Sequence, residues 1–239
     1  MKNIILIPTY NEKDNIKLIV AEIFNLLPEI KILVIDDNSP DGTAEIVKSL
    51  MERHVNLFLL ERQKKTGLGD AYKDAMSRVI KDREIDHIIT MDADGSHSPE
   101  YLQIFLDKIL QHDLVIGSRY TKDGGTVDWE VWRRYLSRFG NLYARFFTGL
   151  AINDFTAGFM CIRRELLERL DFNIIGSSGY SFQIELKFHL IHGLGARAFE
   201  IPIIFKSRRE GESKLSKQII REGIIIPLKL FLKRLWHKK

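Results

Sequence analysis

Cysteine is almost absent from this 239-residue sequence, and the single one, Cys161, excludes any disulfide within the chain. One cysteine leaves the redox compartment open, although the reducing cytosol is favoured. No stretch approaches the roughly 18 uninterrupted apolar residues that a membrane-spanning helix needs. The apolar run at residues 3–7 is too short for a signal peptide and lacks a cleavage site of small residues. We therefore expect a protein that does not cross a bilayer by itself and is not exported by that route.

Two phosphate-binding signatures are missing as well. No G-x-G-x-x-G follows the first predicted strand, and no G-x-x-x-x-G-K-[ST] occurs. Their absence disfavours a nicotinamide-dependent enzyme and a P-loop NTPase. Internal repeats and low-complexity tracts are also lacking. With 45% apolar and 28% charged residues, the chain has the composition of one globular domain with a substantial core.

The net charge of +4 is unevenly distributed. From Lys206 to Lys239 there are 11 Lys and Arg against 3 Glu, a net charge of +8, whereas the rest carries 25 basic and 29 acidic residues, a net charge of −4. A basic segment of this kind is typical of a surface that meets an anionic partner. Nucleic-acid binding is disfavoured, because the body is acidic and the tail is aliphatic rather than interleaved with stacking aromatics.

The spacing of apolar residues predicts strands that alternate with helices. Strands are expected at 3–8, 30–35, 55–60, 87–91 and 114–117, and helices at 12–27, 43–51, 69–80 and 99–110. This order implies right-handed crossovers and a mainly parallel sheet with helices on both faces. In such sheets ligands bind outside the carboxyl ends of the strands, so the loops after the strands are the places to look for chemistry.

Two carboxylates end the fourth predicted strand. Asp92 and Asp94 lie one residue apart, where they can share a hard divalent cation that in turn bridges a diphosphate. The spacing alone carries little information, because 16 Asp in 239 residues would give about one such triplet by chance. Their position at a strand end is the stronger argument. The alternative is an Asx turn and helix cap leading to Ser98 and Pro99.

The loop after the second strand, from Asp36 to Thr43, is acidic. Ionised acceptors there can recognise the hydroxyls and base donors of a nucleoside. For Asp41 and Thr43 a turn and N-cap is the favoured alternative.

Seven segments, taken in order, resemble the GT-A glycosyltransferases of family 2, and specifically the dolichol-phosphate and polyprenol-phosphate mannose synthases. They are Pro-Thr-Tyr-Asn-Glu (8–12), Asp-Asp-Asn-Ser-Pro-Asp-Gly-Thr (36–43), Met-Asp-Ala-Asp-Gly-Ser-His-Ser-Pro (91–99), Gly-Ser-Arg-Tyr (117–120), Asp-Phe-Thr-Ala-Gly-Phe (154–159), Gly-Tyr-Ser-Phe-Gln-Ile-Glu (179–185) and residues 205–215. Each is weak alone, but seven in order over nearly the whole chain are specific.

The resemblance implies a Rossmann-like GT-A catalytic domain over residues 1–215 and a basic amphipathic, membrane-associating tail over 216–239. It implies inverting transfer of mannose from GDP-mannose to a dolichyl or polyprenyl phosphate, giving the β-linked lipid phosphate mannose and GDP. The expected location is the cytoplasmic face of a membrane, peripherally bound.

The resemblance also assigns the donor site. It implies a nucleotide pocket made by Pro8, Tyr10, Glu12, Ile35, Asp37 and Ala93, with Asp92 and Asp94 around Mg²⁺ or Mn²⁺. Ser96 occupies the position where some family members have a metal-binding Gln, and it is a further candidate ligand. Arg208 and Lys214 match a late basic loop that closes over the donor phosphates; a solvated basic tail is their alternative. His97, beside the metal position, is expected to be structural.

On the acceptor side, a lipid phosphate is an anion at neutral pH and can attack without a general base. A clamp of planar guanidinium groups suits it. Arg119, Arg133 and Ser137 match the acceptor-phosphate positions of the similar synthases, and with Asp94 they are expected to act on the reacting groups. Arg134 is the adjacent alternative for this role. A second interpretation is a helix with Arg133, Arg134 and Arg138 on its solvent-exposed face and Leu136, Phe139 and Leu142 on its apolar face, and it is favoured for Arg134 and Arg138. Gln183 and Glu185 come near the active site by resemblance, without an assigned step.

The tail from residue 216 mixes aliphatic residues with Lys and Arg. It is too short to span a bilayer and suits the headgroup plane, with Trp236 at the interface and Pro227 kinking or breaking the helix. The alternatives are a last helix packed on the domain and a docking site for a membrane-spanning partner subunit.

Rival functions remain open at this point. One is a polyprenyl-phosphate glucosyltransferase using UDP-glucose, or another family 2 enzyme with a saccharide acceptor, which would need a catalytic base. The other is a non-catalytic nucleotide-sugar-binding subunit of a membrane complex, which has no need for two phosphate sites.

Overall fold

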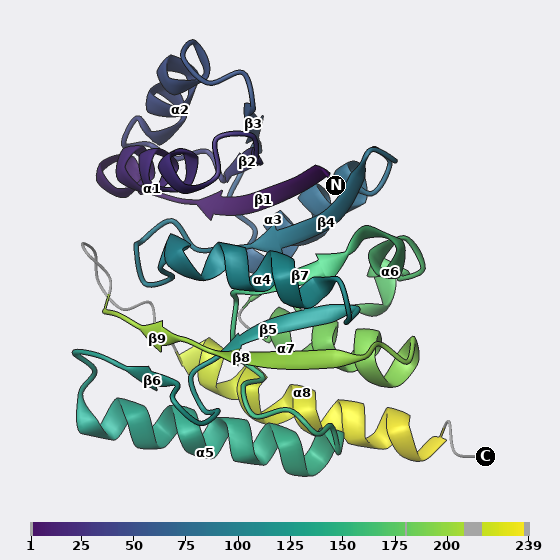
Figure 1. Ribbon diagram of the computed structural model, residues 1–239. Coiled ribbons are helices and arrows are strands. Elements are labelled where there is room, and N and C mark those ends of the chain that lie inside the picture. Colours follow the sequence, from purple (N-terminus) through teal and green to yellow (C-terminus); the bar gives the residue numbers. More distant parts are fainter. Residues whose placement is uncertain (1, 180, 208–216, 237–239) are drawn as a thin grey trace.

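A seven-stranded sheet forms the centre of the protein (Figure 1). The computed structural model describes residues 2–179, 181–207 and 217–236. Its strands are β1 (Lys2–Thr9), β2 (Lys31–Asp36), β3 (Leu57–Glu61), β4 (Ile85–Thr90), β5 (Leu114–Ser118), β7 (Met160–Arg163) and β8 (Ala198–Pro202), in the order β3-β2-β1-β4-β7-β5-β8. Strands β6 (Gly125–Thr126) and β9 (Ile204–Phe205) form a separate small sheet.

Helices cover both faces of the large sheet. They are α1 (Lys13–Leu26), α2 (Thr43–Met51), α3 (Leu68–Val79), α4 (Leu102–Ile109), α5 (Val131–Thr148), α6 (Arg164–Glu168), α7 (Phe182–Phe188) and α8 (Lys217–Trp236), with short helical turns at Pro99–Tyr101, Phe172–Ile174 and His189–Gly193. One apolar core joins the sheet to α1, α2 and α4, and a second joins it to α3, α6, α7 and α8. The predicted elements of the first half are confirmed, with ends that differ by about two residues at most.

Strand β7, which the apolar pattern did not predict, decides where the site lies. Strands β1, β2, β3 and β4 pair in parallel, as do β5 and β8, whereas β7 runs antiparallel between β4 and β5. Met160, its first residue, is the partner of both Thr90 and Ile116. The segment that enters β7 therefore reaches the same edge as the carboxyl ends of β4 and β5.

Helix α5 turns its polar side inward. Its buried residues are Asn141, Ala144 and Thr148. Leu136, Phe139 and Leu142, expected to pack as an apolar face, are 42%, 66% and 65% exposed. That part of the alternative was wrong, whereas Arg134 and Arg138 are exposed as it expected. A helical pattern shows that a helix has two different sides, but not which side packs on the domain.

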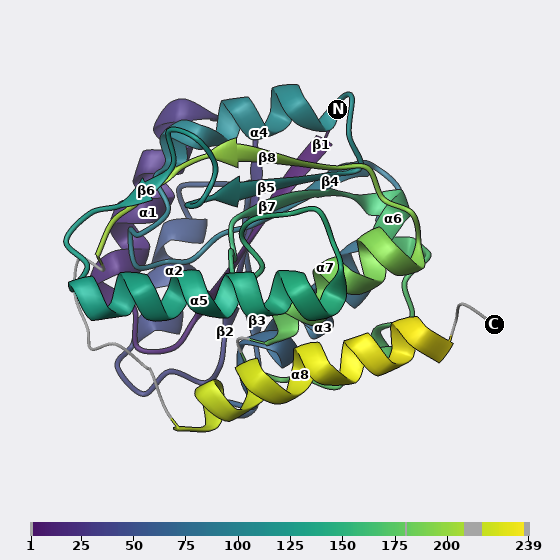
Figure 2. The same ribbon diagram turned by 90° about the horizontal axis from the view of Figure 1, so that it is seen from below.

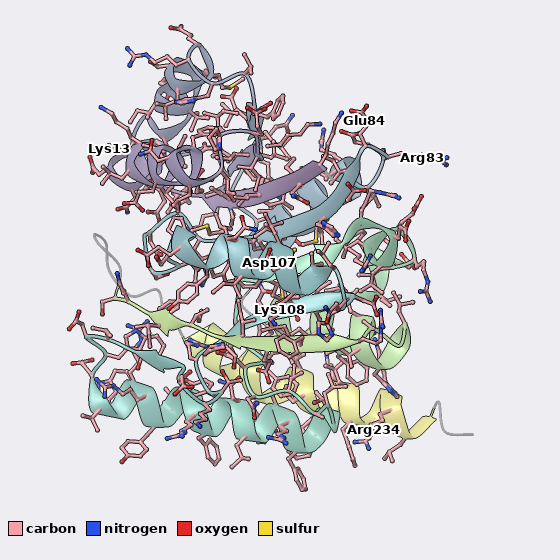
Figure 3. The ribbon with its side chains drawn as sticks, viewed as in Figure 1. Lys13, Arg83, Glu84, Asp107, Lys108 and Arg234 are labelled. Carbon is pink, nitrogen blue, oxygen red and sulfur yellow. The ribbon has the colours of Figure 1, made fainter. Side chains whose placement is uncertain are left out.

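Helix α8 lies beside α5 (Figure 2). Its Ile226 and Leu230 are buried in the core, and the ring of Phe231 meets Phe147 of α5 at 5.7 Å. The helix continues through Pro227, so the expected break is not found there. Arg234, at the lower edge of the molecule in Figure 3, lies against Gly149, the residue that ends α5 with a φ of 69°. A cation at that point complements the negative end of the α5 dipole.

Helices α5 and α8 lie side by side and both expose apolar side chains, which together are here called the apolar face. It comprises Val131, Trp132, Tyr135, Leu136, Phe139, Leu142 and Phe146 of α5 with Ile224, Leu228, Leu232 and Leu235 of α8. Single exposed apolar residues are ordinary, but so many on two adjacent helices mark an interaction surface. Within the described residues, the helices are too short or too polar to span a bilayer.

Candidate active site

The ends of β1 and β2 are tied together by the first carboxylate of the acidic loop. Asp36 is buried and accepts hydrogen bonds from Thr9 Oγ1 at 2.9 Å, Ser39 Oγ at 2.6 Å and the Ser39 amide at 2.8 Å. The Ser39 hydroxyl in turn accepts from the amide of Asn11 at 3.0 Å. These bonds hold the two loops together. They engage the Asp36 carboxylate with groups of the protein itself.

Asp41 and Thr43 hold the start of α1. The Asp41 carboxylate accepts from the Lys13 amide at 3.1 Å and from the Thr43 hydroxyl at 2.6 Å. The Thr43 hydroxyl accepts from the amide of Glu12 at 3.0 Å. The capping interpretation of these two residues is therefore the one that the contacts support, although the helix they cap is α1 as well as their own.

Asp37 is the acidic residue of this loop that joins a cation. It forms a buried ion pair with Arg62, which also donates to Thr66 Oγ1 at 2.7 Å and approaches Asp74 at 3.7 Å. Burial raises the pKa of Asp37, while Arg62 opposes the shift. Arg62 was not singled out from the sequence, because its place follows from the β3 end lying next to the β2 end in the sheet.

The other expected nucleotide contacts surround that pair. Pro8 and Ile35 are Cα partners in the β1–β2 register, and the Lys65 ammonium lies 3.6 Å above the Tyr10 ring. Ile35 and Ala93 have buried side chains, so a ligand would meet them through their backbone.

The carboxylate loop, residues 92–97, follows β4. Asp94 is buried, and its Oδ1 accepts from the Ser96 hydroxyl at 2.6 Å and the Ser96 amide at 3.0 Å. His97 Nδ1 accepts from the amide of Asp92 at 3.1 Å, and burial lowers the His97 pKa, which favours the neutral ring. The ring stacks on Phe159 with centroids 4.9 Å apart. His97 therefore shapes the loop, as expected.

This loop fits a divalent cation that is shared with a substrate. No cluster of three or more His, Cys, Asp or Glu suited to a metal occurs among the described residues. Mg²⁺ commonly uses one or two protein carboxylates and takes its remaining ligands from phosphates and water. Asp92 is partly exposed, and Asp94 is fixed by Ser96. The hydroxyl of Ser96 is thus seen orienting Asp94, and its own part as a ligand stays a prediction.

Three residues form what we call the arginine cluster: Arg119, Trp129 and Arg133. The guanidinium of Arg119 lies 5.5 Å and that of Arg133 lies 4.2 Å from the centroid of the Trp129 ring. Arg119 follows β5, whereas Arg133 lies in the first turn of α5. One indole thus gathers two cations from separate elements, as cation–π contacts allow.

Arg119 is also held by a buried carboxylate. Its Nε and Nη2 donate to the two Asp154 oxygens, both at 2.7 Å, and Nη2 also donates to Thr156 Oγ1 at 2.6 Å. Burial alone would lower the pKa of Arg119, but the charge and hydrogen bonds of Asp154 raise it above its ordinary value. Arg119 is therefore a fixed cation, rather than a mobile one, at the edge of the sheet.

Ser137 lies one helical turn beyond Arg133. Its hydroxyl accepts from the Tyr120 hydroxyl at 2.7 Å, and its carbonyl accepts from Asn141 Nδ2 at 2.8 Å. Asn141 Oδ1 then accepts from the Phe155 amide at 2.7 Å. The polar side of α5 thereby joins the expected acceptor residues to the segment before β7.

That segment, residues 153–159, is named the bridging loop because it lies between the ends of β4 and β5. Lys187 is fully buried and donates to the carbonyls of Phe155 at 3.0 Å and Ala157 at 2.6 Å. Thr90 Oγ1 donates to the Gly158 carbonyl at 2.6 Å. Burial lowers the pKa of Lys187 to about 7.

The structure thus brings two charged groupings to one edge, the carboxylate loop and the arginine cluster. Phe205 of β9 touches both, since its ring lies 5.4 Å from His97 and 5.5 Å from Trp129. The amide of Lys206 donates to the Ser96 carbonyl at 3.3 Å. The chain then leaves toward Arg208 and Lys214, which lie outside the described residues, so their predicted closure over the donor phosphates stays a prediction.

Sequence reasoning missed several side chains that build this edge. Asp154 and Thr156 fall in a segment that carried the resemblance, yet nothing local shows that they bind Arg119. Trp129 had a usable signal, because a tryptophan four residues before an arginine at the start of an amphipathic helix is worth testing as a cation platform. Lys187 had none, since a lone lysine in an apolar helix is normally exposed.

Sequence comparison relates the chain to known glycosyltransferases. The family model of glycosyl transferase family 2 matches residues 4–171. Polyprenol monophosphomannose synthase of Mycolicibacterium smegmatis is 41% identical over 225 residues, which cover 93% of this chain and 84% of that protein. Undecaprenyl-phosphate mannosyltransferase of Micrococcus luteus is 40% identical over 225 residues, which cover 94% of this chain and 92% of that one.

Among solved structures, glucosyl-3-phosphoglycerate synthase of Mycobacterium tuberculosis, in complex with Mn²⁺, UDP and its product, aligns with a TM-score of 0.68 at 17% identity. The alignment covers 96% of this chain and 79% of that one, and it confirms the expected GT-A fold. From the family match and the two curated relatives we conclude that the chain belongs to glycosyl transferase family 2.

Proposed function

We propose that the protein transfers mannose from GDP-mannose to a dolichyl or polyprenyl phosphate, giving the β-linked lipid phosphate mannose and GDP. The single observation that carries the proposal is the pairing of the carboxylate loop with the arginine cluster at one sheet edge. The first suits a metal-bound diphosphate, and the second suits another anion. The names of the two curated relatives, both about 40% identical, support mannose and a polyprenyl phosphate.

The donor would lie across the ends of β1, β2 and β4. Pro8, Tyr10, Glu12, Ile35, Asp37 and Ala93 would bind the nucleotide, with Arg208 and Lys214 over its phosphates. Mg²⁺ or Mn²⁺ would be held by Asp92 and Asp94, with Ser96 orienting Asp94. When bound, the cation would stabilise negative charge on the leaving diphosphate.

The acceptor phosphate would bind Arg119, Arg133 and Ser137. In a single displacement, a phosphate oxygen bonds to the anomeric carbon as the bond from that carbon to GDP breaks, and the electron pair leaves with GDP. The configuration at that carbon inverts. Because the attacking phosphate is already ionised, the side chains need to orient it rather than deprotonate it. Asp154 keeps Arg119 in place, and Trp129 positions both guanidinium groups.

The apolar face would bring this site to the lipid. We extend the predicted membrane-associating segment from the tail to α5, because both helices expose apolar residues on adjacent surfaces. Arg133 and Ser137 face the site from the same helix whose opposite side would enter the headgroup region. The protein would thus act peripherally, at the cytoplasmic face of a membrane, with or without a membrane-spanning partner subunit.

A panel of radiolabelled nucleotide sugars tests the proposal. The protein is incubated with polyprenyl phosphate, a divalent cation and either GDP-mannose or UDP-glucose, and the organic-phase product is identified. We expect labelled lipid from GDP-mannose, and none when EDTA is added. Label from UDP-glucose alone, or transfer to a saccharide alone, would reassign the donor or acceptor. GDP-mannose binding by calorimetry without any turnover would indicate the non-catalytic subunit.

A further inference from the structure

Gln183 is a buried amide whose polar atoms are unused. It lies in the first turn of α7 and is 1% exposed, and neither its Oε1 nor its Nε2 has a hydrogen-bond partner among the described residues. An amide offers two donors and two acceptor positions. Leaving them buried without partners is costly, and groups of this kind call for an explanation.

The neighbouring polar residues of α7 are satisfied. Glu185 accepts from the Ser177 amide at 2.7 Å. Lys187, one helical turn after Gln183, donates to two carbonyls of the bridging loop. Both hold backbone in place, which is the common task of a buried polar side chain. Gln183 lies among them but holds nothing, so a structural task does not account for it.

Its position is next to the proposed metal loop. A Cβ placed on Gly158 would lie 3.6 Å from Gln183 Nε2, 3.7 Å from His97 Cε1 and 3.8 Å from Asp92 Oδ1. The amide, the ring and the carboxylate therefore meet around a residue that has no side chain. The Gly158 carbonyl is fixed by Thr90, which keeps this part of the bridging loop in register.

We infer that Gln183 binds a hydroxyl of the transferred sugar and sets specificity for it. This inference rests on the proposed function. The sugar must lie between the diphosphate at the carboxylate loop and the phosphate at the arginine cluster, because its anomeric carbon joins the two in turn. Gln183 and Asp92 both border Gly158 of the bridging loop, and the same loop carries Thr156, which accepts a hydrogen bond from Arg119. A sugar hydroxyl both donates and accepts, which matches an amide able to do both.

Gly158 is the matching feature of the backbone. A side chain at this position would lie directly against the Gln183 amide. Contacts of 3.6–3.8 Å from an added Cβ are ordinary van der Waals distances, so alanine fits the fold while filling that space. The two positions thus offer separate ways to disturb one contact.

The test pairs Gln183→Leu with donors that lack one hydroxyl. The wild-type protein is assayed with GDP-mannose and with its 2-, 3-, 4- and 6-deoxy analogues. We expect one analogue to lose on the order of 100-fold in kcat/KM, and Gln183→Leu to lose a similar factor with GDP-mannose. With that one analogue, the variant should lose little more, because the same contact is already gone. Gln111→Leu, at an exposed glutamine just after the end of α4, is the control.

Stability separates this role from a structural one. Replacing an unpartnered amide by an apolar side chain of similar size should leave the melting temperature unchanged or raise it. Gly158→Ala should keep the fold and GDP binding but lose transfer. A strong fall in melting temperature of Gln183→Leu, or equal losses of Gln183→Leu with GDP-mannose and with every analogue, would overturn the inference. If wild type labels no lipid from GDP-mannose, it is the proposed function that fails.

Discussion

The carboxylate loop and the arginine cluster occupy one edge of the sheet but are built differently. In the first, Asp94 is oriented by a serine two residues away, and the ring of His97 folds back on the amide of Asp92. In the second, Arg119 is held by Asp154, 35 residues later, and shares an indole with a helix that starts beyond it. A local motif can therefore be read from sequence, while a tertiary cluster depends on which strands become neighbours.

The largest effect should follow from changing the local site. Asp94→Asn keeps the shape of the side chain. It removes the negative charge with which the carboxylate would bind the divalent cation, and the diphosphate would bind through that cation. Metal-dependent transfer should fall on the order of a thousandfold. The thermal transition should stay close to that of wild type, since the amide oxygen of the variant can still accept the hydrogen bonds that Ser96 donates. Full activity of this variant in saturating Mg²⁺ or Mn²⁺ would remove Asp94 from the metal site.

A change in the arginine cluster should first lower the free energy of unfolding. Asp154→Ala leaves Arg119 buried without its carboxylate, and breaking such a pair from one side typically costs about 3 to 5 kcal/mol in the free energy of unfolding. Urea unfolding measures the loss. The double variant Arg119→Met with Asp154→Leu should recover much of it, while still failing to transfer sugar. A single variant that is as stable as wild type would mean that the pair is dispensable for the fold.

Replacing Arg133 should affect acceptor binding with less effect on stability than replacing Asp154, because Arg133 is only partly buried on α5. Arg133→Ala should lower kcat/KM for polyprenyl phosphate by about 10- to 100-fold, the usual cost of losing a hydrogen bond to a charged group. Arg134→Ala, the exposed neighbour, is the matched control and should behave like wild type. Equal losses in the two variants would point to a general charge effect and against a clamp.

The apolar face should matter for lipid contact alone. Phe139→Glu and Leu232→Glu should each weaken binding to anionic vesicles by about tenfold or more, since burying such side chains contributes about 1.5 to 3 kcal/mol. Transfer to a short, water-soluble prenyl phosphate should persist. Val55→Glu serves as control, because Val55 is exposed just before β3, the outermost strand at the other end of the strand order from β8. These substitutions are sharper than truncation of α8, which would uncover the core around Ile226 and Leu230.

A further effect is a pH dependence at the bridging loop. Burial lowers the pKa of Lys187 from 10.5 to about 7. Between those values the unfolded chain holds a proton that the folded protein has released. The contribution of Lys187 to the free energy of unfolding therefore increases as the pH rises through that window. Compared with Lys187→Met, wild type should gain stability from pH 7 to pH 10; a constant difference would show that the lysine stays charged.

Much of the fold was predictable from the sequence, because local patterns determine it as they determine the carboxylate loop. Strands β1, β2, β4 and β5 are apolar runs that end in polar loops, and parallel order follows from the helices between them. Strand β7 was not predicted, because Met160–Arg163 is only four residues long and its sequence does not alternate between apolar and polar residues. The resemblance supplied Arg119, Arg133 and Ser137 as site residues, but it gave no role to Asp154 or Lys187, whose partners are distant in sequence.

Helix α5 shows the limit most clearly. The alternative that placed Leu136, Phe139 and Leu142 on a packed apolar face was wrong, because the domain-facing side is made of Asn141, Ala144 and Thr148. Arg134 and Arg138 are exposed, as that alternative expected. Asn141 was not singled out from the sequence, although its side-chain Oδ1 accepts a hydrogen bond from the Phe155 amide of the bridging loop. Only the positions of β7 and α8 in the fold show that the polar residues on this side of α5 have partners within the protein.

The most direct test of two separate anion sites is calorimetry of GDP binding in the presence of Mn²⁺, with wild type, Asp94→Asn and Arg133→Ala measured side by side. The account predicts that Asp94→Asn abolishes metal-dependent GDP binding, whereas Arg133→Ala binds GDP like wild type despite its loss of transfer. Comparable weakening of GDP binding in both variants would place Arg133 in the donor site and contradict the division.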